Sequence, residues 1–248
     1  MIKIEHVVLA SPEQMQFIIE GMRNPMNSWD KSDSVNCNLS CYWCKYAGTD
    51  NCAKAEWSED DSFGIGKKDK SLMQRLSKAG TDHRKFMRMM PVYARITAPL
   101  YYWKEFDTYK VGTVANSCST MHKISEKEFM LADFSYEHLG DSEKYPYAQV
   151  SPLDSLKETI KVLNGFRDAY IEYDTSPFKD SFGTKKDIWW QMIQLLPSSY
   201  NQTRNVMMNY EVLANMYHSR KNHKLDEWRE FCKWIETLPY SYLITGKE

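Results

Sequence analysis

Four cysteines fall close together near the start of the chain, and thiolates are strong ligands for zinc and iron. Cys37, Cys41, Cys44 and Cys52 lie within sixteen residues. Four thiolates can close a tetrahedral zinc site or hold an iron–sulfur cluster. Metal–sulfur bonds would also fix a segment that has few apolar residues of its own. The cluster therefore predicts a zinc site, an iron–sulfur cluster, or four reduced cysteines without a metal.

The first three cysteines have the spacing C-x3-C-x2-C, which resembles the motif of radical S-adenosylmethionine enzymes. In those enzymes the motif follows the first strand of a barrel, and repeated strand–helix units come after it. Here a helix and a polar loop are expected before the motif, and mostly helical residues follow it. A glycine-rich segment for S-adenosylmethionine is also absent. We therefore interpret residues 30–65 as a Cys-rich insertion, with zinc favoured if it binds a metal.

A second group of chemically useful side chains lies late in the chain. Asn209, Asn215 and Arg220 occur between about 201 and 221, a segment that we expect to form one long helix. Asn209 and Arg220 are eleven residues apart, close to three helical turns, so they would share a face. Arg can bind a phosphate or a carbonyl edge, and Asn can pair with an amide or imide edge. The residue types suit nucleobase recognition, although taken alone they favour a solvated helix face.

The composition is ordinary for a globular protein. The chain has 248 residues, of which 42% are hydrophobic and 26% charged, enough for one large domain or two small ones. The net charge of −1 excludes a whole-protein basic field that would attract nucleic acid or an anionic membrane. The N-terminus lacks the apolar run of a signal peptide, and no stretch approaches ~18 consecutive apolar residues. We therefore expect a cytoplasmic protein.

Helix dominates the expected secondary structure. Strands are expected at 2–9 and 92–99, where β-forming residues are frequent. Ser11 and Pro12 predict the start of a first helix, and Ser125-x-x-Glu128 has the pattern of a capping box. Together these elements predict a helix-rich α+β protein with a single domain over 1–248. The further helices are expected at about 70–78, 83–90, 101–106, 151–172, 187–196, 201–221 and 225–238.

The order of these features resembles the flavin-dependent thymidylate synthase family. The likeness rests on the first strand and helix, on His83, on a strand that leads into Ala98-Pro99, on Asn116-x-x-Ser119, and on a late Leu-Pro before spaced Asn and Arg. The resemblance implies that family's α+β fold and a homotetramer that binds FAD at subunit interfaces. It also implies an enzyme of pyrimidine metabolism, which methylates dUMP at C5 with methylenetetrahydrofolate and NADPH. Neither nucleic acid nor a membrane is an expected partner.

The resemblance also assigns site residues. Ser119 would lie beside C5 of the base and Arg220 would polarise the pyrimidine, so both are catalytic candidates. The substrate would be bound by Ser119, Asn215, Arg220 and Arg204. The flavin would be bound by His83, Lys110, Asn116, Asn209 and Asn215.

Several arginines of the family pattern are replaced. The signature Arg-His-Arg corresponds to about Tyr109-Lys110-Val111, and the final Arg-Tyr becomes Met121-His122. Ile193 takes the approximate place of an Arg before the late Leu-Pro. Because each charge-assisted contact contributes roughly 1.5–3 kcal/mol, other cations must replace them or the ligand must differ. The alternatives are therefore a non-catalytic nucleotide-binding protein on the same fold, or a metal-binding protein acting through its cysteines.

Overall fold

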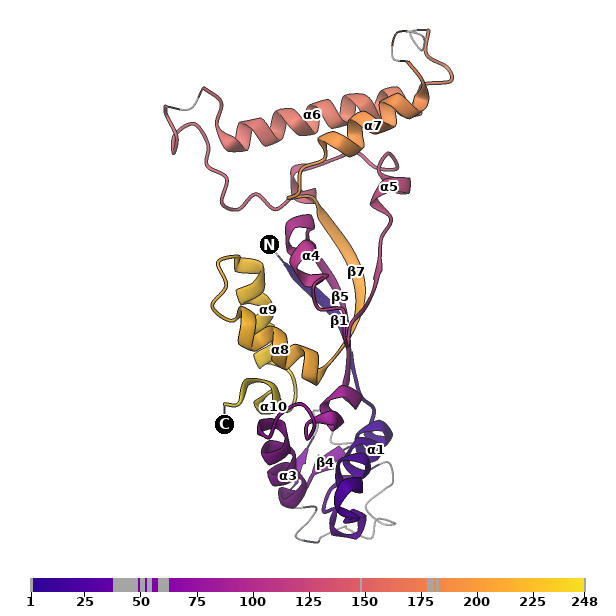
Figure 1. The fold of residues 1–248 in the computed structure, drawn as a ribbon. Helices are drawn as coiled ribbons and strands as arrows, with labels where there is room; N and C mark the ends of the chain where they lie inside the picture. The colour runs from indigo at the N-terminus through magenta and orange to yellow at the C-terminus, as the bar shows by residue number, and fades with distance from the viewer. Residues whose placement is uncertain are drawn as a thin grey trace. The chain divides into compact units, whose positions relative to one another are not determined.

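The structure is a computed structural model that describes residues 2–37, 49, 52, 55–57, 63–147, 149–177, 181 and 183–247. The chain divides into two compact units (Figure 1). Unit 1 consists of Met1–Lys3, Ile96–Asp107 and Asn116–Arg204. Unit 2 consists of Ile4–Arg95, Thr108–Ala115 and Asn205–Glu248.

A four-stranded sheet has the order β1-β5-β7-β6. Each of its strands contributes residues to both units. Along β5, alternate side chains are buried, as expected for a strand with one face against a core. The strands are β1 (Lys3–Leu9), β5 (Pro91–Pro99), β7 (Asn201–Asn209) and β6 (Val114–Ser117).

Unit 1 has a core formed by two long helices and the loops before them. The helix α6 (Pro152–Ile171) packs along α7 (Lys185–Leu195), and Figure 1 shows the two side by side. The hydroxyl of Ser151 accepts a hydrogen bond from the backbone of Asp154 and so caps α6. Two short helices, α4 (Leu100–Phe106) and α5 (Thr120–Lys123), and the 3-10 turn η4 (Leu131–Asp133) complete the unit. Buried members of this core are Ile124, Phe129, Phe134, Leu156, Ile160, Leu163 and Met192.

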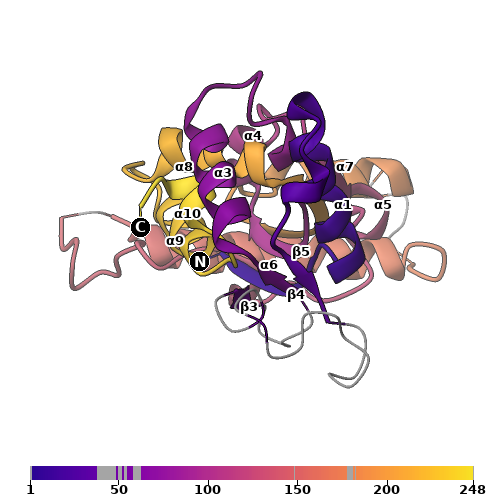
Figure 2. The same ribbon diagram turned by 90° about the horizontal axis from the view of Figure 1, so that it is seen from below.

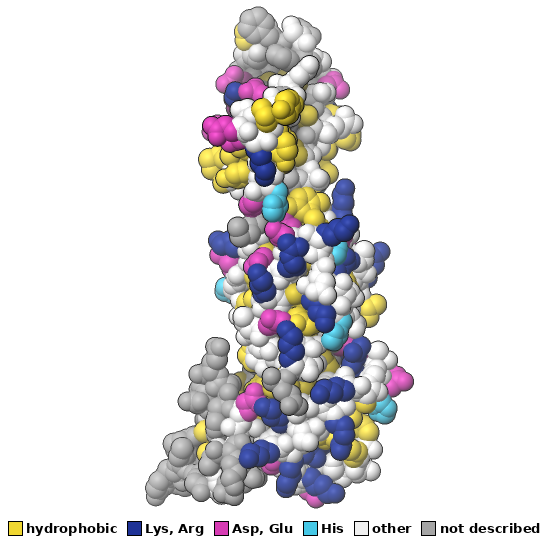
Figure 3. All heavy atoms as spheres, turned by 90° about the vertical axis from the view of Figure 1, so that its left-hand side faces the viewer, with side chains coloured by type: hydrophobic (Ala, Val, Ile, Leu, Met, Phe, Trp, Pro, Cys, Tyr) yellow, Lys and Arg dark blue, Asp and Glu magenta, His cyan; other side chains and the backbone are white. Residues whose placement is uncertain are grey.

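Unit 2 is built around α8 (Tyr210–Arg220), which packs on α9 (Asp226–Glu236), α10 (Tyr242–Thr245) and the 3-10 helix η3 (Lys85–Met89). Two further helices, α1 (Pro12–Arg23) and α3 (Lys67–Lys78), contact η3 and α10 respectively. Figure 3 shows many Lys and Arg side chains on the face turned to the viewer, with Asp and Glu side chains among them.

A small second sheet in unit 2 has the antiparallel order β2-β4-β3; Figure 2 labels its strands β3 and β4. Its strands are β2 (Val35–Asn36), β4 (Phe63–Ile65) and β3 (Glu56–Trp57). The 3-10 turns η1 (Asn24–Met26) and η2 (Trp29–Lys31) lead from α1 toward it. In the sequence, β2 therefore comes just before the four clustered cysteines, and β3 comes after them.

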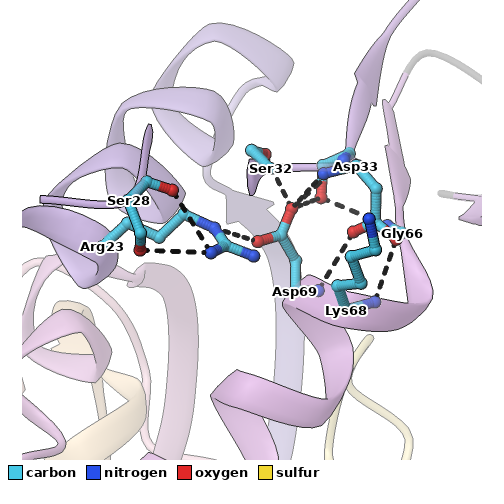
Figure 4. Close-up of polar contacts among 8 residues, drawn as sticks. Arg23, Ser28, Ser32, Asp33, Gly66, Lys68 and Asp69 are labelled. Atoms are coloured by element: carbon cyan, nitrogen blue, oxygen red, sulfur yellow. Dashed lines mark hydrogen bonds and ion pairs between the residues drawn. The ribbon is translucent and has the colours of Figure 1, made fainter. Parts of the chain in front are cut away.

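A buried ion pair fixes this region (Figure 4). Nε of Arg23 donates to Oδ1 of Asp69 at 2.6 Å, and both side chains are almost fully buried. The other oxygen of Asp69 accepts from the hydroxyls of Ser32 and Ser34, each at 2.7 Å, and from two backbone N–H groups. The Asp69 charge is therefore compensated by hydrogen bonds on both oxygens, as burial of a carboxylate requires.

Asp33 holds the start of α3 in the same cluster. Its two carboxylate oxygens accept from the backbone N–H groups of Lys68 and Asp69 at 3.0 and 3.1 Å. Gly66 comes so close that a Cβ there would lie 2.3 Å from the Asp33 carboxyl carbon. A side chain at position 66 would therefore push Asp33 away from the helix N-terminus.

The α+β fold class and most helices are confirmed. The helices α4, α6 and α9 lie within two residues of their expected ends, and α1 starts at Pro12 as expected. The expected single helix over 201–221 is wrong, because its first nine residues form β7 between β5 and β6, and the helix starts at Tyr210. The capping-box pattern at Ser125 does not start a helix, and the expected helix at 83–90 is the shorter η3.

The structure divides the chain into two compact units, and the domain organisation expected from the sequence stays a prediction. The single domain over 1–248 and the insertion over 30–65 both remain expectations, and much of 30–65 lies outside the described residues. Among the described residues, none of the helices combines the length and apolar character that crossing a bilayer requires.

Candidate functional site

Arg220, at the C-terminal end of α8, is held by aromatic side chains of unit 2. Its Nε donates to the hydroxyl of Tyr109 at 3.0 Å, and its Nη1 contacts Nε2 of His223 at 3.0 Å. The guanidinium lies 4.9 Å from the centre of the buried Trp228 ring, a distance at which cation–π attraction acts. The planar donor group of Arg220 is therefore oriented before any ligand binds.

Asn209 lies at the other end of α8, where it caps the helix. Its Oδ1 accepts from the backbone N–H of Val212 at 2.9 Å. Gly112 has a φ of +84°, and a Cβ there would lie 2.8 Å from Nδ2 of Asn209. Since Tyr109 contacts Arg220 and Gly112 contacts Asn209, the segment Thr108–Ala115 runs along α8. This segment also carries the exposed Lys110.

Asn215 and Glu211 on α8 are tied to the arginines of η3 and the turn before it. Nε of Arg84 donates to Glu211 at 3.1 Å, and Nη2 of the same side chain donates to Oδ1 of Asn215 at 3.1 Å. Arg88 forms a second ion pair with Glu211. Burial opposes ionisation of Glu211, but the bonds from Arg88 and Arg84 outweigh it and hold its pKa below the usual value. The exposed His83, next to Arg84, is thereby fixed near α8.

Ser119 lines a cavity of about 410 Å³ in unit 1. It precedes α5, and its hydroxyl accepts from the backbone N–H of His122 at 3.3 Å. The cavity wall also includes Lys123, Lys127 and the ring of Tyr200. A hydrogen bond with Asp133 raises the pKa of Lys127, and burial raises the pKa of Tyr200. The cavity thus combines hydroxyl groups, the carboxylate of Glu126, aromatic surface and two lysines, which pair with Glu126 and Asp133.

Arg204 belongs to unit 1 and is held on three sides. Its guanidinium lies 4.2 Å from the centre of the Trp103 ring, its Nε donates to Gln202 at 2.9 Å, and its Nη1 donates to Asp107 at 2.6 Å. Gln202 in turn donates to the hydroxyl of Thr120 at 3.0 Å, beside Ser119. Arg204 is therefore connected to the cavity wall through Gln202.

The sequence matches no known family model and no curated protein sequence. The structure, in contrast, resembles solved structures over almost its whole length. The flavin-dependent thymidylate synthase ThyX from Helicobacter pylori, complexed with FAD and dUMP, superposes with a TM-score of 0.58 at 16% identity, covering 99% of this chain and 98% of that chain. A second structure of this enzyme with FAD and dUMP gives 0.57 at 14% identity, with the same coverage.

This chain has the fold of the flavin-dependent thymidylate synthases. The UMP/dUMP methylase PolB from Streptomyces cacaoi, bound with 5-Br dUMP, is also similar. Its TM-score is 0.50 at 13% identity, and the match covers 99% of this chain and 95% of that chain. The resemblance expected from the sequence is thus found in the fold, with sequence identities that establish no more than the fold.

On this ThyX-like fold, the candidate residues fall into two sets. In unit 2, the candidates Asn209, Asn215 and Arg220 at α8 lie against two other segments, which carry the candidates His83 and Lys110. Unit 1 contains the remaining three, of which Ser119 and Arg204 are linked through Gln202 and Thr120, and Asn116 is exposed on β6. The unit 2 set is His83, Lys110, Asn209, Asn215 and Arg220.

Sequence reasoning missed the polar residues that orient these candidates. Glu211 and Arg84 are 127 positions apart, and Arg204 and Asp107 are 97 apart, so no local pattern signals either pair. Gly112 is a local signal that was available, because glycine adopts a positive φ without strain, and the φ of Gly112 is +84°.

The predicted metal ligands Cys41 and Cys44 lie outside the described residues, so the four-cysteine site does too. Cys37 directly follows β2, and Cys52 precedes β3. Within the described part of the chain, no three His, Cys, Asp or Glu side chains gather as a metal site would need. The metal prediction therefore stays a prediction.

Proposed function

We propose that this protein binds FAD and a deoxyuridylate-type nucleotide and transfers a one-carbon unit to C5 of the pyrimidine. The observation that carries the proposal is the match over 99% of the chain to an enzyme complexed with FAD and dUMP. The UMP/dUMP methylase among the similar structures supports the same class of substrate. The polar residues of the two units support it further, because their chemistry suits these ligands.

The cavity beside Ser119 suits a nucleotide. The aromatic ring of Tyr200 offers a stacking surface for a pyrimidine. Lys123 and Lys127 would bind a phosphate by exchanging their partners Glu126 and Asp133 for it. The guanidinium of Arg204 is joined to the cavity wall by two hydrogen bonds, from Arg204 to Gln202 and from Gln202 to Thr120. In this proposal Ser119 orients the base close to C5, and Asn116, exposed on β6, contributes to flavin binding.

The α8 residues suit a flavin. Asn209 and Asn215 both use their carbonyl oxygens within the protein, which leaves their amide nitrogens to donate. Together with Lys110 and His83 they form a donor-rich set, and FAD presents acceptor oxygens on its pyrophosphate and its ring carbonyls. When bound, the flavin would supply the hydride chemistry, while the protein supplies binding and orientation.

The family resemblance makes Arg220 of unit 2 a catalytic candidate in this proposal. Its guanidinium is fixed by Tyr109, His223 and Trp228, so little conformational entropy is lost when it binds. A fixed cation beside a pyrimidine carbonyl withdraws electrons from the ring and stabilises negative charge that develops there. Arg220 would therefore both bind and polarise the nucleotide.

A second candidate function is nucleotide binding without catalysis. It is favoured by the arginines that already have carboxylate partners, since Arg204 pairs with Asp107, and Arg84 and Arg88 pair with Glu211. The two functions differ in one measurable property. A non-catalytic protein would bind dUMP but would not oxidise NADPH in the presence of FAD.

The family resemblance supplies further proposals. They include methylenetetrahydrofolate and NADPH as co-substrates, a homotetramer, a cytoplasmic location and zinc on the cysteines. The tetramer is tested by sedimentation velocity, in which a monomer at micromolar concentration would contradict it.

The absorption spectrum of the purified protein, before and after incubation with FAD and desalting, tests the proposal. We expect a flavin band that stays with the protein and changes when dUMP is added. Colourless protein that retains no added FAD would overturn the proposal.

A further inference from the structure

In the ion pair between Arg204 and Asp107 in unit 1, the two side chains differ in their exposure to solvent. The Arg204 side chain is 15% exposed, and the Asp107 side chain is 52% exposed. Besides Asp107, Arg204 has the ring of Trp103 against its guanidinium and Gln202 as acceptor for its Nε. Because these two contacts hold Arg204 without Asp107, the carboxylate is the partner that can move away.

Helix capping does not explain the position of Asp107. It lies at the C-terminal cap of α4, where the helix dipole presents its negative end and disfavours a carboxylate. The guanidinium of Arg204, 2.6 Å away, offsets this repulsion. Its ion pair with Arg204 is therefore the favourable contact that keeps the Asp107 carboxylate at this position.

Arg204 also connects this ion pair to the cavity beside Ser119. The Nε group donates to Oε1 of Gln202, whose Nε2 donates to the hydroxyl of Thr120 and to the carbonyl of Cys118. Cys118 and Thr120 flank Ser119 and line the cavity with it. An acceptor bound to Arg204 therefore lies two hydrogen bonds away from the cavity wall.

We propose that Asp107 acts as a displaceable counter-ion that occupies Arg204 until the phosphate of a nucleotide replaces it. The identity of the ligand rests on the proposed function, but the competition between Asp107 and an anion does not. An ion pair as exposed as this one contributes little in water. Phosphate oxygens form stronger charge-assisted bonds with a guanidinium, and can bind its fork at two points. Asp107 thus makes the site selective for ligands that carry a phosphate.

The variant Asp107→Asn tests the proposal, because Asn keeps an acceptor for Arg204 but has no charge. Binding of dUMP and of deoxyuridine is measured by isothermal titration calorimetry for wild type and variant. The expected result is that Asp107→Asn binds dUMP about two- to fivefold more tightly, with deoxyuridine affinity unchanged. Equal change for both ligands, or no change for either, would overturn the proposal.

Two further variants distinguish the effect of the Arg204–Asp107 ion pair from a general effect of removing a negative charge. Glu158→Gln removes a carboxylate from an exposed ion pair elsewhere in unit 1, and should leave dUMP affinity unchanged. In the Arg204→Gln background, Asp107→Asn should no longer strengthen dUMP binding. A gain that persists without Arg204 would contradict the proposal.

A separate experiment distinguishes failure of the proposed function from failure of the role of Asp107. If neither protein binds dUMP, the nucleotide proposal fails, and inorganic pyrophosphate becomes the probe. In a thermal-shift titration, pyrophosphate should then stabilise Asp107→Asn at lower concentrations than wild type. Identical titration curves for the two proteins would overturn the role of Asp107.

Discussion

Arg220 and Tyr109 are joined twice: Nε of Arg220 donates to the Tyr109 hydroxyl at 3.0 Å, and the guanidinium lies 5.7 Å from the centre of the Tyr109 ring. Tyr109 stands at about the position where the family resemblance would put the first Arg of the signature. In this chain that position therefore orients an arginine of α8 and does not itself supply a cation.

Tyr109→Phe should weaken nucleotide binding without unfolding the protein. The substitution keeps the ring beside Arg220 and removes one hydrogen bond, which contributes about 0.5–1.5 kcal/mol, or roughly two- to tenfold in affinity. Arg220→Gln should lose more, at least about tenfold. Fluorescence titration with dUMP measures both. The control is Lys233→Gln, which removes an exposed cation on α9 and should bind dUMP as wild type does. If Tyr109→Phe bound dUMP with wild-type affinity, Tyr109 would not orient Arg220 for binding.

Asn209 variants should separate its structural role from its flavin-binding role. Asn209→Ser retains a side-chain acceptor for the cap and should keep stability, whereas Asn209→Ala should lose about 0.5–2 kcal/mol. Both lack the amide nitrogen, so both should lose FAD affinity. Urea unfolding gives the stabilities, and flavin retention after desalting gives the binding. Full FAD retention by the stable Ser variant would show that Asn209 only caps α8.

Glu211→Gln should make stability less dependent on pH. The pKa of Glu211 is lowered in the folded protein from an ordinary value of 4.5. A lowered pKa means that Glu211 stabilises the fold above about pH 4.5 and that this contribution is lost as pH falls below it. Thermal unfolding should therefore give a lower Tm for Glu211→Gln at pH 7, with a difference that shrinks toward pH 4. A Tm difference that stays constant over this range would contradict the ion pairs with Arg84 and Arg88.

Asp69→Asn should destabilise the protein strongly. The substitution leaves the buried Arg23 without a charged partner, and breaking such a pair costs roughly 3–5 kcal/mol. Urea unfolding measures the change. Asp30→Asn, at an exposed residue of η2, is the control and should stay within about 0.5 kcal/mol of wild type. Similar losses for the two variants would argue against a specific role for the Arg23–Asp69 pair.

The zinc hypothesis for the cysteine cluster is tested by metal content. It predicts one equivalent of zinc in anaerobically purified protein, lost in Cys41→Ser and retained in Cys118→Ser, whose thiol is remote in sequence. Elemental analysis of the three proteins decides this. Wild type without zinc or iron would end the metal hypothesis.

Local sequence signals predicted the starts of α1 and α6, two helices with side-chain caps. Ser11 with Pro12, and Ser151 with Pro152, mark the first residues of α1 and α6, and the structure has both caps. These signals act within one turn of helix, so a single sequence is enough to read them.

Non-local pairing decided what the sequence did not predict. Residues 201–209 form β7 because β5 and β6 are available on either side, and this moves Asn209 from a helix face to a helix cap. The strands of the second sheet are two or three residues long, too short for an alternating pattern. Likewise, the ion pairs that orient Arg84 and Arg204 join distant segments.

One-carbon transfer to a pyrimidine nucleotide is tested by identifying the product of the reaction. FAD-loaded protein is incubated with dUMP, methylenetetrahydrofolate and NADPH, and the nucleotide is analysed by mass spectrometry and NMR. The account predicts a nucleotide with a new methyl group at C5, formed by wild type and lost in Arg220→Gln. Unchanged dUMP from wild type that has bound both FAD and dUMP would contradict it.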